Sequence, residues 1–197
     1  MRKYISHILI ISFVFIAIPI TSATGGSKTL RSHYRSLSVS EVQSMPNVSI
    51  REKTKWGFIG HSTINHDYSL KAVSGDVVVV DNATGLMWHQ GGSVDWLNWN
   101  YAKEWIEDLN SRGYAGYQDW RLPTVEEAAS LLESSKKNGN LYTAPVFSKK
   151  QQWILTGDKV DGSEAAWHVF FIHGSVDWLF NIYYNRYGYV RPVRSVE

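Results

Sequence analysis

The sequence contains no cysteine, which excludes a disulfide framework and all thiol-based chemistry. It also lacks a phosphate-binding glycine loop, a Gly-x-Ser-x-Gly elbow and a His-Glu-x-x-His zinc motif. Charged residues make up 19% of the chain and hydrophobic residues 44%, so there is enough apolar material for a globular core. These absences favour a protein that is not an enzyme, and no residue set predicts a catalytic site, a cofactor or a metal.

Residues 1–23 have the layout of a secretory signal peptide. A basic start at Arg2 and Lys3 precedes an apolar run over residues 8–18 and small residues at 21–23. The run is shorter than the roughly 20 residues that a membrane span needs. We therefore expect an exported protein with no transmembrane segment in the mature chain, in the periplasm, at the cell surface or outside the cell.

The expected cleavage also changes the charge balance. The full chain has 20 Lys and Arg against 18 Asp and Glu, and cleavage would remove Arg2 and Lys3 but no acid. The mature chain would then be close to neutral, which argues against a nucleic-acid partner.

Residues 24–55 are rich in Ser and Arg and predict a linker. Within it, Ser40 and the following residues fit a capping box before a very short helix that Pro46 would end. The ordered domain is expected over residues 56–197.

Local patterns in that domain predict strands, two helices and further strands. A β-branched run at 76–81, a turn at 82–85 and an apolar run at 86–89 predict a hairpin. Apolar residues spaced as on one helix face predict the first helix: Ala102, Trp105, Ile106 and Leu109. Thr124 with Glu127 forms a capping box for the second.

The remaining chain predicts strands over 152–156, 166–172, 176–184 and 189–193, with a turn at 157–162. This order indicates an α+β fold: a compact single domain with two helices packed on short, mostly antiparallel strands.

Aromatic residues are abundant, with nine Trp, eleven Tyr and seven Phe. Aromatic faces stack on sugar rings, and Asn and Arg side chains supply hydrogen bonds. We therefore expect a ligand face that comprises Trp178, Asn181, Tyr183, Tyr184, Asn185, Arg186 and Tyr187. A second candidate patch comprises His89, Gln90, Trp96 and Trp99.

One hexapeptide, Gly-Ser-Val-Asp-Trp-Leu, occurs at 92–97 and again at 174–179. Its flanks differ, which argues against a duplicated domain. We interpret the two copies as similar corners, each leading from a glycine turn into a strand with a buried Trp; a pair of equivalent surface loops is the alternative.

Three segments in order, 81–88, 119–124 and 190–194, resemble the C-terminal domain family of the collagen-like adhesin Lcl, long a domain of unknown function. The resemblance covers roughly residues 76–195. It implies a bacterial exported protein, a fold similar to C-type lectins and formylglycine-generating enzymes, and, from the namesake adhesin, a glycosaminoglycan-like ligand and a trimer. The chain has neither collagen-like repeats nor the calcium–sugar tripeptides of true C-type lectins.

The residues that carry this resemblance are expected to be structural. They are Trp88, Trp120, Arg121, Thr124, Glu127, Arg191 and Arg194. We expect a non-catalytic binding module for a polysaccharide or another cell-surface polymer. The alternatives are a module that binds an envelope protein and a hydrolytic enzyme whose carboxylates come from distant segments.

Overall fold

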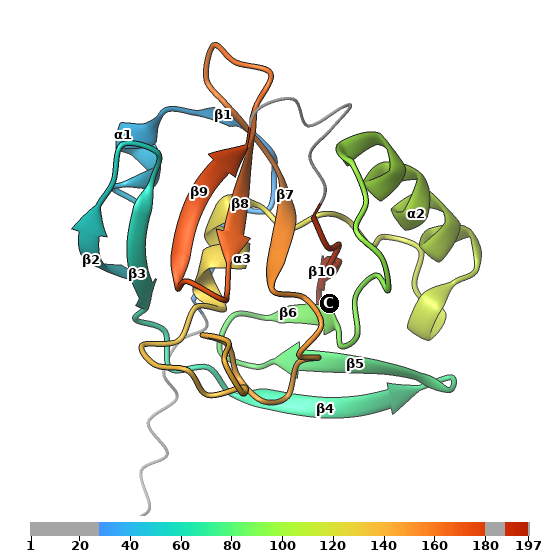
Figure 1. Ribbon diagram of the computed structural model, residues 1–197. Coiled ribbons are helices and arrows are strands. Elements are labelled where there is room, and N and C mark those ends of the chain that lie inside the picture. Colours follow the sequence, from blue (N-terminus) through green and yellow to red (C-terminus); the bar gives the residue numbers. More distant parts are fainter. Residues whose placement is uncertain (1–27, 180–187, 197) are drawn as a thin grey trace, which may run out of the picture.

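The computed structural model describes residues 28–179 and 188–196. Strands dominate this part of the chain, forming two curled sheets with a few helices, which is broadly an α+β architecture (Figure 1). None of the helices in this part is long and apolar enough to cross a membrane.

The smaller sheet has four antiparallel strands in the order β10-β6-β5-β4. The strands are β4 (Tyr68–Val73), β5 (Asp76–Asp81), β6 (Leu86–His89) and β10 (Val193–Ser195). The predicted hairpin is confirmed as β5 and β6, joined by a turn in which Gly85 has a φ of 68°. Glycine takes this left-handed conformation without a steric penalty.

The larger sheet has six strands in the order β1-β7-β8-β9-β3-β2. They are β1 (Ser36–Leu37), β2 (Val48–Lys53), β3 (Phe58–Ser62), β7 (Trp153–Val160), β8 (Ala166–Phe170) and β9 (Ser175–Leu179). Neighbouring strands are antiparallel except β1, which runs parallel to β7.

Part of the predicted linker is folded. Within residues 28–55, β1 and β2 join the six-stranded sheet, and helix α1 (Val39–Val42) lies between them. The helix does have a capping box, but Ser38 and Glu41 form it, two residues earlier than predicted. The described domain thus includes segments well before residue 56.

The turn predicted at 157–162 is also wrong in part. Strand β7 runs through Gly157 to Val160, and the chain turns only at Asp161. Gly157 is required inside the strand because a Cβ there would lie 2.1 Å from the ring of Tyr34. The last strand begins at Val193, whereas Tyr189 makes an isolated bridge to Ile154.

Both predicted helices are present, as α2 (Trp99–Ser111) and α3 (Val125–Ser130), and a short 3-10 helix η1 (Tyr114–Gly116) follows α2. The side chain of Asn98 caps α2 by accepting the Tyr101 amide. Thr124 and Glu127 form the expected capping box of α3.

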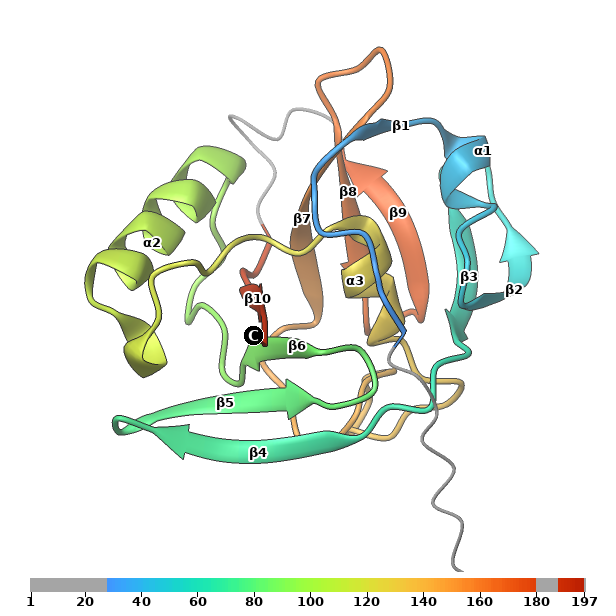
Figure 2. The same ribbon diagram turned by 180° about the vertical axis from the view of Figure 1, so that it is seen from behind.

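Two hydrophobic clusters make up the core. Helix α3 packs with Trp88 and Trp167 between the two sheets, covering one face of β7 and β8 (Figure 2). Helix α2 packs over Leu155, Trp120 and Val190. In Figure 1, α2 and β2 lie at opposite ends of the molecule.

Candidate functional site

The first predicted ligand face lies mostly outside the described residues. Asn181, Tyr183, Tyr184, Asn185, Arg186 and Tyr187 belong to that undescribed stretch. Trp178 is described, and its ring packs edge-on against Trp56 at 4.8 Å between centroids. It also packs against the core cluster that contains α3, so Trp178 is half-buried.

The second predicted patch is divided in the structure. The His89 imidazole stacks on Tyr114 at 4.2 Å, and its Nδ1 accepts the Gly92 amide. Burial lowers the pKa of His89 to about 4, so its ring is neutral at pH 7. Gln90 donates its side-chain amide to the Val146 carbonyl. Trp99, the first residue of α2, is 7% exposed, whereas Trp96 is 54% exposed.

Trp96 belongs instead to a row of aromatic side chains that sequence reasoning did not assemble. We name this row the aromatic strip: Trp96, Trp153, Phe170 and His173. Trp96 and Trp153 lie 5.2 Å apart between ring centroids, Trp153 and Phe170 6.3 Å, and Phe170 and His173 6.3 Å.

Strand register explains why these rings share one face. Trp153 on β7 stands directly opposite Phe170 on β8, so both side chains point to the same side of the sheet. Their neighbours Ile154 and Val169 point the other way, into the cluster around α3. Trp153 and Phe170 are half-buried, and His173 is exposed. The strip therefore lies on the face opposite α3.

A hollow of about 340 Å³ adjoins the strip. Its lining is Val94, Asp95, Trp96, Lys150 and Tyr189. The Trp96 ring meets Tyr189 edge-on at 6.0 Å. A carboxylate, an ammonium group and two aromatic rings thus converge on one shallow site.

The loop that carries Trp96 is fixed at its start by buried polar contacts. The Ser93 amide donates to the Val190 carbonyl at 2.8 Å, and the Ser93 hydroxyl oxygen accepts the Val190 amide at 3.0 Å. The same hydroxyl donates to the Asp95 carbonyl at 2.8 Å. The buried side chain of Gln151 donates to the Ser93 carbonyl at 2.9 Å. These contacts hold the loop, so an exposed tryptophan stands on a supported backbone.

The other parts of the same loop are equally constrained. Gly92 has a φ of 65°, and a Cβ there would lie 2.6 Å from the Val190 carbonyl oxygen. At the far end, Leu97 and Gly188 exchange two backbone hydrogen bonds of 2.9 and 3.0 Å. The loop is therefore ordered already in the folded protein, so binding a ligand would require little further loss of its conformational entropy.

The two hexapeptide copies share their glycine geometry but not their surroundings. Gly92 and Gly174 have φ values of 65° and 67°. After Gly174 the chain forms β9, in which Trp178 is half-buried, whereas after Gly92 it forms the supported loop with exposed Trp96. The interpretation as two similar corners, each leading into a strand with a buried Trp, is therefore wrong for the first copy.

The residues expected to be structural make internal contacts. Trp88 and Trp120 are 0% and 2% exposed. Arg121 donates to both carboxylate oxygens of Glu127, at 2.7 and 2.6 Å. Arg194 donates to Asp119 at 2.7 Å, and its guanidinium lies over the Tyr117 ring at 3.8 Å.

Arg191 is fully buried, and no described carboxylate pairs with it. Its guanidinium donates to Gln151 Oε1 at 3.0 Å and lies 4.5 Å from the centre of the Phe147 ring. Burial lowers its pKa to about 9, which leaves it charged at neutral pH. Arg191 thus holds the Gln151 side chain, which in turn donates to the Ser93 carbonyl at the start of the Trp96 loop.

A histidine–aspartate pair could suggest catalysis, but its contacts indicate a structural role. His66 Nδ1 lies 2.7 Å from Asp81 Oδ2, and His66 Nε2 lies 2.7 Å from the Ser130 carbonyl. Both ring nitrogens thus face oxygen atoms of the protein itself, which leaves neither of them directed at a bound substrate. Within residues 28–179 and 188–196, no group of three or more His, Cys, Asp or Glu side chains could hold a metal ion.

Comparison with curated proteins and with solved structures gave no match. The model of the Lcl C-terminal domain family matches residues 77–194, which is more than half of the chain. The matched region holds α2, α3, the aromatic strip and the buried arginines, whereas β1 to β4 precede it. The chain therefore belongs to the Lcl C-terminal domain family.

Proposed function

We propose that this protein is an exported, non-catalytic binding module that takes a glycan or another cell-surface polymer on the aromatic strip. The observation that carries the proposal is the exposed ring of Trp96, held on a supported loop next to Trp153. Tryptophan is costly to leave exposed, and a fixed aromatic face with polar groups nearby suits a sugar ring. Family membership is consistent with an adhesin-like role.

The chemistry around the strip favours hydrogen bonding combined with stacking. Asp95 offers acceptor oxygens and Lys150 offers donors, so a sugar hydroxyl can donate to the first and accept from the second. One lysine and one aspartate leave the hollow nearly neutral, which favours a neutral polymer over a highly sulfated one. The C-type-lectin-like similarity and the ligand face at 178–187 stay predictions.

The test is a glycan-array screen of the purified protein at two salt concentrations, followed by affinity measurement on any hit. We expect Trp96→Ala to raise the Kd by about tenfold or more, which corresponds to about 1.4 kcal/mol. The matched control is Trp56→Ala, which removes a tryptophan that is 41% exposed and packs on Trp178.

The two variants separate the candidate faces. If Trp96→Ala loses affinity for the glycan and Trp56→Ala binds as tightly as the wild type, the aromatic strip is supported as the binding site. The opposite result moves the site to the Trp178 face. Binding that weakens steeply with salt would indicate an anionic polymer and contradict the neutral-glycan proposal.

A further inference from the structure

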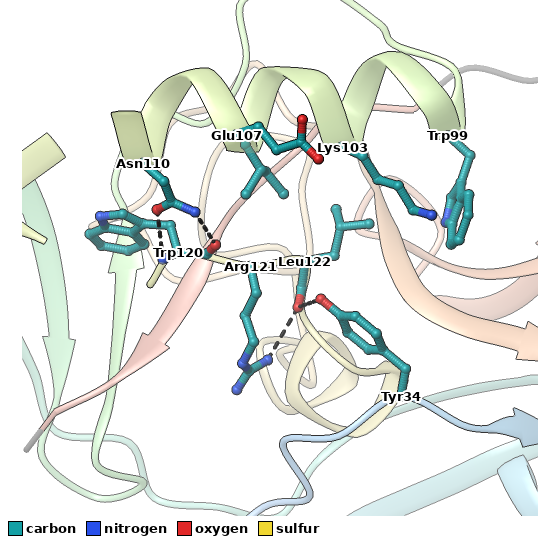
Figure 3. Close-up of a pocket in the computed structure, with 9 residues that line it drawn as sticks. Tyr34, Trp99, Lys103, Glu107, Asn110, Trp120, Arg121 and Leu122 are labelled. Atoms are coloured by element: carbon teal, nitrogen blue, oxygen red, sulfur yellow. Dashed lines mark hydrogen bonds between the residues drawn. The ribbon is translucent and has the colours of Figure 1, made fainter. Parts of the chain in front are cut away.

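A second hollow, with a different set of lining residues, lies beneath α2 (Figure 3). It has a volume of about 340 Å³ and is lined by Tyr34, Trp99, Lys103, Ile106, Glu107, Asn110, Trp120, Arg121 and Leu122. A volume of this size falls in the range of small-molecule sites, at its lower end.

The inner surface of this hollow is apolar. Trp99, Ile106, Trp120 and Leu122 are between 2% and 7% exposed. The polar atoms of the two indoles are already bonded, because Trp99 Nε1 donates to the Thr156 carbonyl and Trp120 Nε1 to the Tyr114 carbonyl. The inner surface therefore offers a ligand apolar contact only.

Tyr34 closes the side of the hollow away from α2, as Figure 3 shows. Its hydroxyl donates to the Leu122 carbonyl at 3.0 Å, and its ring lies against the bare backbone of Gly157. Tyr34 remains 46% exposed, so one part of its side chain borders solvent while the ring packs on Gly157. The wall is fixed before any ligand arrives.

Lys103, the one lysine among the described residues that line the hollow, lies at its Trp99 end, apart from Glu107 (Figure 3). The Lys103 ammonium lies 3.7 Å from the centre of the Trp99 ring, and the Lys159 ammonium 5.2 Å from it. Lys103 makes no ion pair with any described carboxylate, although Glu107 is one helical turn away. Arg121 contributes little net charge because Glu127 neutralises it with two hydrogen bonds.

We infer that this hollow is a binding site for a small amphipathic monoanion, with its apolar body on Ile106, Trp120 and Leu122 and its anionic group beside Lys103. Glu107 disfavours negative charge farther along the helix, so the anion belongs at the Trp99 end. The site is independent of the aromatic strip and does not depend on the function proposed above.

The experiment uses three probes with one phenylbutyl body and different charge: 4-phenylbutyrate, 4-phenylbutanol and 4-phenylbutylamine. The purified protein is titrated at low salt while the indole N–H signals of Trp99 and Trp120 are followed by NMR. We expect the carboxylate to shift both signals and to bind about fivefold more tightly than the alcohol, with the amine weakest.

The variant Lys103→Glu is expected to remove the preference for the carboxylate while leaving alcohol binding unchanged. The matched control is Lys53→Glu, the same charge change at an exposed position on β2, at the far end of the molecule. The proposal is overturned if no probe shifts the two indole signals, or if Lys103→Glu and Lys53→Glu bind the carboxylate equally well. Trp96→Ala should leave this binding intact, which separates it from the glycan site.

Discussion

Replacing Arg31 with alanine tests whether the segment before β1 is an integral part of the fold. The Arg31 guanidinium donates to both carboxylate oxygens of Asp158 at 2.9 and 2.8 Å, and its Nε donates to Glu126 at 3.3 Å. The side chains of Arg31 and Asp158 are 9% and 0% exposed. Asp158 also accepts the amides of Arg35 and Val125, which joins this segment to β7 and to the start of α3.

The expected magnitude follows from this burial. Removing one partner of a buried ion pair leaves the other charge in a poorly solvated place and typically costs about 3–5 kcal/mol. Arg35 supplies the matched control, because it pairs with Glu41 through side chains that are 49% and 46% exposed. A solvent-exposed pair of this kind contributes about 0–1 kcal/mol.

Urea unfolding at pH 7, followed by tryptophan fluorescence, measures both variants. We expect Arg31→Ala to lose about 3 kcal/mol or more of unfolding free energy, and Arg35→Ala about 1 kcal/mol or less. Equal losses in the two variants would refute the reasoning and would mean that the buried pair does not hold the segment to the domain.

Two pH-dependent predictions concern other buried groups. Burial lowers the pKa of His168 to about 4, so between pH 7 and pH 4 the unfolded chain takes up a proton that the folded protein does not, and the free energy of unfolding falls. We expect His168→Leu to reduce this fall, measured by denaturation at pH 7 and pH 5. An equal fall in the variant and the wild type would contradict the prediction. Burial alone would raise the pKa of Asp81, but hydrogen bonds from His66 and Thr84 outweigh this and lower it. Asp81→Asn should therefore cost about 2 kcal/mol at pH 7, a difference that shrinks toward pH 3; a constant difference would count against it.

Local signals in the sequence were enough for several elements. The β5–β6 hairpin, the stripe of α2 and the capping box of α3 each depend on residues a few positions apart, and all are present. Such elements are specified by periodicity, turn chemistry and capping, which do not require knowledge of the rest of the fold.

Elements that depend on distant partners were not predictable. Strand β1 has only two residues and pairs with the end of β7, and Arg31 is 127 positions from Asp158. Gly157 indicated a turn, but its bare backbone serves to receive the Tyr34 ring. In each case the reason for the residue lies in a segment far away in the sequence.

The candidate site shows the same division. Trp96 was in a predicted patch because its segment is aromatic, yet its true neighbours, Trp153 and Phe170, come from two later strands. Alternation along each strand could place these rings on one face, but only the register of β7 against β8 makes them adjacent. His89 and Trp99 were grouped with Trp96 by closeness in sequence, and burial separates them.

The most direct test of the central claim is to titrate the best glycan from the array into the protein and follow the indole N–H signals by NMR. The account predicts that the signals of Trp96 and Trp153 shift in proportion to occupancy, while those of Trp56 and Trp178 stay in place. Shifts confined to Trp56 and Trp178 would contradict it, as would an array on which the folded protein binds no glycan.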